Sequence, residues 1–183
     1  MPISKIDASS LGGTALSSSI TTASGLSLGI TMYDMWRLSN DLTGNHEPIA
    51  TNLERVDTAT QSFIGSAMTQ SSGIFTFPST GIYYIQFHAD IVDATEQAYV
   101  SGAITTTTDN STYNTIAVAQ QHLKLINDSN TYCNSVSQCI FDVTNTTTHK
   151  VRFAIGCQNN DINLNGNTGR NDTNAIFIRL ADT

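Results

Sequence analysis

The sequence predicts an all-β protein, an antiparallel jelly-roll β-sandwich with an extended N-terminal arm. Segments in which apolar and polar residues alternate recur along most of the chain, and turn-forming residues separate them. Only 13% of the residues are charged, while Ser, Thr and Asn together make up about a third of the chain. Low charge with high polarity disfavours solvated helices, which need Glu, Lys and Arg on their outer face.

Residues 1–25 are expected to form the arm, and residues 26–183 a single jelly-roll domain. The arm is rich in Ser, Thr, Ala and Gly, and its apolar residues are too sparse to form a core face. A disordered tail and an arm that becomes ordered on a neighbouring molecule both fit this composition. We expect the second, with contacts to another copy of the chain or to a capsid.

The strands of the domain are expected in sequence order. The first begins at Leu26, where apolar residues alternate with small or polar ones up to Met32, and Trp36 and Leu38 continue the pattern. A long loop is predicted at residues 159–174, and it could hold one short strand. The other strands are predicted at residues 63–68, 74–77, 82–92, 98–107, 112–125, 132–143, 150–157 and 175–180.

The aromatic residues on these strands identify the expected core. Tyr83, Ile85 and Phe87 share one face of the longest strand, because side chains alternate between the two faces of a β-strand. With Phe153 and Phe177 from two later strands, they are predicted to point inward or into a subunit interface.

Residues 73–89, GIFTFPSTGIYYIQFHA, resemble the core signature of the globular head of complement first component, subunit q. That head shares its fold with tumour necrosis factor. The family pattern is Gly-x-aromatic, then Pro-x-x-Gly-x-Tyr, then a central strand of alternating apolar and aromatic residues. Pro78 and Gly81 would fix the turn, since Gly adopts backbone conformations that other residues avoid. The resemblance implies compact trimers that act as binding heads.

The arm and the segments at residues 36–38 and 53–57 also resemble jelly-roll virion proteins of marine bacteriophages. We therefore expect a homotrimeric virion structural protein, located on the virion surface and assembled in the host cytoplasm. Its expected role is capsid decoration, as a cement protein on the outside of a phage head, in contact with the major capsid protein or another virion protein. The alternative is the receptor- or glycan-binding knob of a tail fibre. The lack of a long repeated shaft favours decoration.

Charge and hydropathy disfavour several partners. The formal net charge of −7 and the scattered Lys and Arg residues disfavour nucleic acid and anionic membranes. No apolar run is long enough to span a bilayer. Cys133 and Cys139 would lie roughly 20 Å apart on one strand, so we expect free thiols, as suits a reducing cytoplasm.

The sequence does not predict an enzyme, because it contains no Gly-x-Ser-x-Gly elbow, phosphate-binding loop or His-x-x-x-His pair. His88 is expected to be a packing or interface residue on the polar face of its strand. Four strand aromatics could stack on sugar rings, although a core or subunit-interface position is the preferred interpretation. They are Tyr83, Tyr84, Phe87 and Tyr99.

One loop has the spacing of a calcium-binding loop, with oxygen-bearing side chains at positions one, three and five, glycine at six and a carboxylate at twelve. The candidate calcium ligands are Asp161, Asn163, Asn165, Asn167 and Asp172. The alternative is an Asn- and Gly-rich surface loop, because only two carboxylates are present and no helices flank the loop. No other cofactor is predicted.

Overall fold

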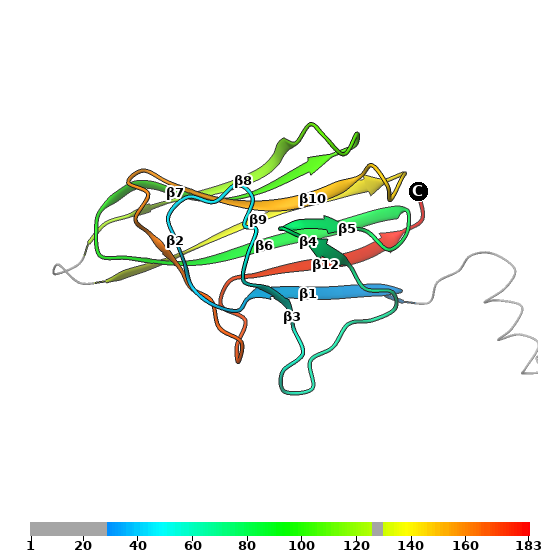
Figure 1. The fold of residues 1–183 in the computed structure, drawn as a ribbon, viewed down its shortest axis with the longest axis horizontal. Coiled ribbons are helices and arrows are strands. Elements are labelled where there is room, and N and C mark those ends of the chain that lie inside the picture. The colour runs from blue at the N-terminus through cyan, green and yellow to red at the C-terminus, as the bar shows by residue number, and fades with distance from the viewer. Residues whose placement is uncertain (1–28, 126–129) are drawn as a thin grey trace, which may run out of the picture.

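The computed structural model describes residues 29–125 and 130–183. In this part of the chain it contains twelve β-strands and no helix, in two antiparallel sheets (Figure 1). No helix that could cross a membrane occurs among these residues. The predicted arm at residues 1–25 lies outside the described residues. The all-β prediction is confirmed.

Sheet A has β6 at its centre. Strand β9 pairs along the whole length of β6, and β12 and β11 pair with successive parts of its other edge. Strand β1 then pairs with β12, and β3 with β1. The seven strands are β1 (Met32–Leu38), β2 (Leu42–Thr43), β3 (Leu53–Arg55), β6 (Gly81–Asp93), β9 (Thr131–Val143), β11 (Asn163–Leu164) and β12 (Asn174–Ala181).

Sheet B has five strands in the order β4-β5-β10-β7-β8. They are β4 (Thr69–Ser71), β5 (Ile74–Thr76), β10 (Lys150–Cys157), β7 (Gln97–Thr107) and β8 (Asn114–Leu123). The strand predicted at residues 63–68 is wrong, because these residues make only an isolated bridge between Ile64 and Tyr33. Gly65 interrupts the segment at φ +68°, a conformation that breaks a regular strand.

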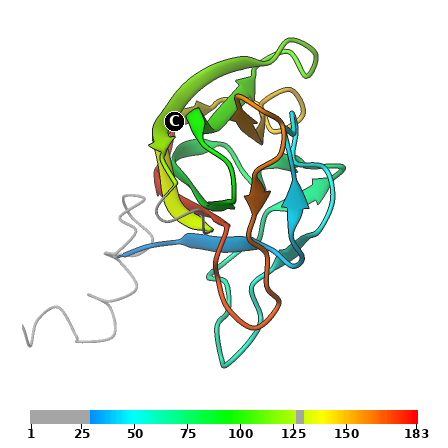
Figure 2. The ribbon, with the colours of Figure 1, turned by 90° about the vertical axis from the view of Figure 1, so that its left-hand side faces the viewer.

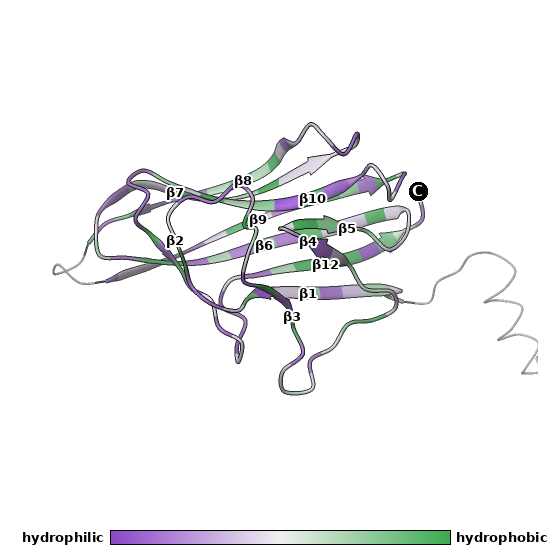
Figure 3. Ribbon diagram, viewed as in Figure 1, coloured by the Kyte–Doolittle hydropathy of each residue, from purple (hydrophilic) through white to green (hydrophobic). Residues whose placement is uncertain are grey.

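The core lies between the two sheets and is rich in aromatic rings. Phe87 stacks on Phe153 with ring centroids 4.9 Å apart, and Phe75 lies 5.2 Å from Phe177. The predicted inward direction of Tyr83, Ile85, Phe87, Phe153 and Phe177 is confirmed, since each is at most 2% exposed. Figure 3 shows the underlying alternation of apolar and polar residues along the strands.

The turn into β6 has the geometry that the sequence pattern predicts. Gly81 has φ +145°, and a Cβ atom there would lie 2.7 Å from the carbonyl oxygen of Ala181. Only glycine therefore fits this position. The turn is closed by the hydroxyl of Tyr83, which donates to the carbonyl oxygen of Ser79 at 3.0 Å.

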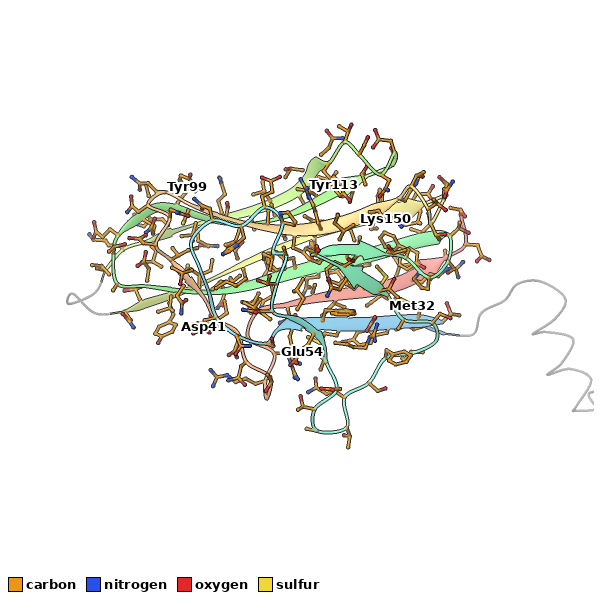
Figure 4. The ribbon with its side chains drawn as sticks, in the orientation of Figure 1. Met32, Asp41, Glu54, Tyr99, Tyr113 and Lys150 are labelled. Atoms are coloured by element: carbon orange, nitrogen blue, oxygen red, sulfur yellow. The ribbon has the colours of Figure 1, made fainter. Side chains whose placement is uncertain are left out.

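The sandwich has two distinct ends. At the first, which we call the terminal pole, Met32 pairs with Arg179 and Ile82 pairs with Ala181, so β1 begins beside the end of β12. The opposite end, the distal pole, carries the turn between β6 and β7 and the loops that follow β1 and β10. Figure 2 looks at the sandwich from the distal pole. In Figure 4, Asp41 and Tyr99 lie toward this pole and Met32 toward the other.

Candidate assembly face

The outward face of sheet A carries a row of apolar side chains across four strands. The register places Ile140 of β9 opposite Tyr84 of β6, Tyr84 opposite Ile178 of β12, and Ile178 opposite Tyr33 of β1. These residues alternate with the buried core residues, so they point away from the core. Ile140 is 66% exposed and the other three are half-buried.

The next row toward the distal pole is mixed. It contains Gln138, Gln86, Ile176 and Met35. The hydroxyl of Tyr84 lies 2.8 Å from Gln138 Oε1 and 3.0 Å from Gln86 Oε1. A phenol has a single proton, so one of the two glutamines presents its amide nitrogen to the phenol oxygen. The hydrogen bonds among Tyr84, Gln86 and Gln138 therefore involve uncharged groups only.

We call these two rows the assembly face. Its eight residues are Tyr33, Met35, Tyr84, Gln86, Gln138, Ile140, Ile176 and Ile178. None of them carries a charge at neutral pH. Burial, together with the neighbouring charge of Asp34, raises the pKa of Tyr33, which keeps its phenol protonated. Leu180, which is 53% exposed, extends the apolar surface toward the terminal pole.

The face becomes more polar beyond these rows. The third row contains Val136, His88, Asn174 and Arg37. His88 Nδ1 lies 2.9 Å from the carbonyl oxygen of Asp172. A carbonyl oxygen only accepts, so Nδ1 carries a proton and donates it. The expected position of His88 on the polar face of its strand is confirmed.

Buried charged side chains on the two faces of β1 connect β1 to β3. Arg37 is 1% exposed, and its Nε donates to Glu54 Oε1 at 2.7 Å. The fully buried Asp34 accepts from Arg55, as well as from Trp36 Nε1 at 3.1 Å. Sequence reasoning missed both pairs. The sequence contained one sign of a buried ion pair: Asp34 is a charged residue on the apolar face of a predicted strand.

No model of a known protein family matches the chain, and a search of curated proteins finds no match. Among solved structures, murine APRIL at pH 8.5 is similar with a TM-score of 0.58 and 14% identity, over 81% of this chain and 98% of that one. The structure of Eiger TNF from S. frugiperda has a TM-score of 0.64 and 12% identity, over 85% of this chain and 96% of that one. The fold is a TNF-like jelly roll. At these identities the likeness concerns the fold alone.

In the TNF-like jelly roll, the predicted calcium ligands lie between the end of β10 and the start of β12, each with hydrogen-bond partners of its own. Asp161 accepts from Thr95 and Gln97. Asn163 donates to Asp41, Asn165 donates to Asp90, Asn167 accepts from Gly169, and Asp172 pairs with Arg170. Asn163 belongs to β11, the short strand that the sequence allowed within this loop. Calcium binding stays a prediction, and it would require Asp172 to leave Arg170.

The other candidate side chains fall into separate places on the TNF-like jelly roll. Tyr84 lies on the assembly face, whereas Tyr99 is 44% exposed near the distal pole. Among the described residues no group of three His, Cys, Asp or Glu side chains could hold a metal.

The three cysteines are free thiols, as predicted. Cys157 is buried, and Cys133 and Cys139 are half-buried on β9. Burial raises the pKa of Cys139 to about 11. Burial, together with the charge of Asp90, also raises the pKa of Cys133. Both thiols therefore stay protonated at neutral pH and are poor nucleophiles.

Proposed function

We propose that this chain is a structural virion protein that forms a homotrimer and decorates the outside of a phage head. The observation that carries the proposal is the assembly face. Its apolar residues lie side by side across four strands, and no element among residues 29–125 and 130–183 forms a second layer over Ile140. Contiguous apolar surface that is partly exposed, as here, is typical of a protein–protein interface.

A second copy of the chain is the occupant that fits this face best. The two rows have no charge, so a second copy can approach them without repulsion between like charges. The aromatic and aliphatic side chains supply the apolar centre of an interface, and the Tyr84 network supplies hydrogen bonds at its border. Head-to-tail contacts through this face give a ring with cyclic symmetry when the rotation between copies closes. The number three follows from the sequence resemblance to trimeric binding heads.

The virion role rests on the resemblance of the arm and of residues 36–38 and 53–57 to jelly-roll phage proteins. The fold adds one supporting relationship. The first described strand, β1, begins at the terminal pole, next to the apolar row of the assembly face. In a cyclic trimer built on this face, the three β1 strands therefore begin at the same pole.

Two substitutions test the homotrimer. Ile140→Arg places a charge at the most exposed point of the apolar row, and Val118→Arg places the same charge on the outward face of sheet B, where Val118 is 55% exposed. Light scattering of the native chain should give three times the 19.7 kDa of one copy. The Ile140 variant should dissociate and the Val118 variant should not. A native monomer, or equal behaviour of the two variants, would overturn the proposal.

The number of copies on each particle tests the virion role and separates decoration from the fibre knob. Quantitative mass spectrometry of purified particles should find many copies for each copy of a tail component. A few copies confined to the tail would support the knob, and complete absence from particles would reject a virion role.

A further inference from the structure

A polar pocket of about 240 Å³ opens at the distal pole, away from the assembly face. Its wall is formed by Val92, Asp93, Ala94, Asn130, Asp161 and Asn163. The pocket is smaller than the roughly 300–1,000 Å³ that hold drug-sized ligands, so its size suits one small ring. The lining comes from the end of β6, the residue before β9, and the loop and strand that follow β10.

Two carboxylates in this wall are fixed by the same pair of donors. Gln97, which is fully buried, donates both hydrogens of its amide nitrogen, one to Asp93 Oδ2 and one to Asp161 Oδ1. The hydroxyl of Thr95 lies 3.0 Å from Asp93 Oδ2 and 2.9 Å from Asp161 Oδ2, and its one proton can serve only one of them. The carboxylates are thus rigid and keep unused acceptor capacity.

These acceptors have no cationic partner. Within the described residues, the ion pairs involve neither Asp93 nor Asp161. The amide of Asn130 makes no hydrogen bond to any described residue and is available to a ligand. The pocket therefore offers carboxylate acceptors and one free amide, and its negative charge disfavours anions.

An exposed aromatic ring flanks the pocket. Tyr132 pairs with Val92, and Val92 pairs on its other edge with Asn163, so the three share one row of sheet A. Cross-strand neighbours in such a row have Cβ atoms about 5 Å apart. Tyr132 is 66% exposed, which leaves its ring free to pack against a ligand that enters beside Val92.

We propose that this pocket binds an uncharged sugar residue. Sugar hydroxyls donate to the carboxylates of Asp93 and Asp161, a further hydroxyl contacts the Asn130 amide, and the apolar face of the ring packs against Tyr132. The site is built within one copy and does not depend on the proposed trimer. Tyr84 and Val92 are eight residues apart on β6, about 26 Å, so the pocket stays open when the assembly face is covered.

Saturation-transfer difference NMR with glucose, galactose, mannose and N-acetylglucosamine tests the proposal on the full chain. At least one of these sugars should receive saturation, with an affinity in the millimolar range that is usual for single small contacts. Asp161→Asn and Tyr132→Ala should each weaken that binding about tenfold. Tyr99→Ala is the matched control, because it removes another exposed tyrosine near the same pole, and it should leave binding unchanged.

Three results would overturn the proposal. The first is the absence of transfer to all four neutral sugars, and the second is equal binding by the native chain and both pocket variants. The third is binding of N-acetylneuraminic acid alone, which would mean that the site accepts an anion. Adding calcium chloride without sugar distinguishes a cation site, since resonances of the pocket would then shift without any sugar. Light scattering of each variant separates these outcomes from a failure to assemble.

Discussion

Arg55 lies against the fully buried carboxylate of Asp34, with its Nε 3.1 Å from Asp34 Oδ1. The same guanidinium donates to the carbonyl oxygen of Met68 and lies 4.7 Å from the centre of the Trp36 ring. The backbone N–H of Met68 completes the set by donating to Asp34 Oδ2 at 2.8 Å. One ion pair therefore connects β1, β3 and the segment that enters β4.

Replacing Arg55 with Met should lower the free energy of unfolding by about 3 kcal/mol. Removing one partner of a buried ion pair leaves the other charge without compensation, which typically costs 3–5 kcal/mol, and the partial exposure of Arg55 favours the lower value. Urea denaturation measures the change. As a control, Glu47→Gln removes an exposed pair with Arg152 and should cost less than about 1 kcal/mol. If the two substitutions lowered the free energy of unfolding equally, the buried carboxylate of Asp34 would not depend on Arg55 for its stability.

Phe87→Ala should destabilise the domain by about 3–5 kcal/mol, because it leaves a cavity beneath the stacked ring of Phe153. Tyr99→Ala removes an aromatic ring of similar size from the surface and should change the free energy of unfolding by less than about 0.5 kcal/mol. Thermal and urea denaturation both report the difference. A Phe87 variant as stable as the native chain would contradict its place in the core.

Asp109 gives the turn between β7 and β8 a dependence on pH. The backbone N–H of Thr112, the Thr107 hydroxyl and the backbone N–H of Ser111 all donate to its carboxylate, and they hold its pKa well below the usual range. A lowered pKa in the folded state stabilises the fold above the unfolded-state pKa, near 3.9, and this contribution is lost as the pH falls.

Asp109→Asn should therefore destabilise the protein at pH 7, and the difference from the native chain should shrink below about pH 4. Asparagine keeps the oxygen that accepts these bonds but lacks the charge, so the comparison isolates the charge. Urea denaturation at several pH values measures it. A difference that stays constant down to pH 2 would contradict the assignment.

Deletion of residues 2–24 tests the arm, which lies outside the described residues. Ordering such a segment costs about 1–2 kcal/mol per residue, so contacts on a neighbour must offset that cost. We expect the truncated protein to remain a trimer but to lose binding to particles in a co-sedimentation assay. If it binds particles as well as the full chain does, the jelly-roll body carries the attachment.

The sequence predicted the fold because the aromatic residues of its long strands keep a strict alternation. Phe87 and Phe177 are buried in the core, as this alternation predicts, and Pro78 and Gly81 mark the turn between β5 and β6. The segment at residues 63–68 misled the prediction. Its Phe63 and Ile64 are exposed, its Met68 is buried in the core, and its one bridge, from Ile64 to Tyr33, does not make a strand.

The candidate sites could be predicted only in part. The outward direction of Ile176 and Ile178 follows from alternation within one strand. Their place beside Tyr84 and Ile140 depends on the register between strands far apart in the chain, which one sequence does not specify. The pocket is harder to predict from the sequence than the assembly face. Asp93 and Asp161 come together only when the turn after β6 folds against the loop after β10.

The pairing of Met32 with Arg179 matters for anyone who wishes to engineer this protein. Because β1 starts where β12 ends, a reporter fused after Thr183 emerges beside the start of β1. A linker of modest length can instead join the two ends, and a circular permutant opened at the Asp109–Thr112 turn would keep every strand of the sandwich. Peptides meant for display belong on the loops of the other pole, where they point away from the start of β1 and the end of β12.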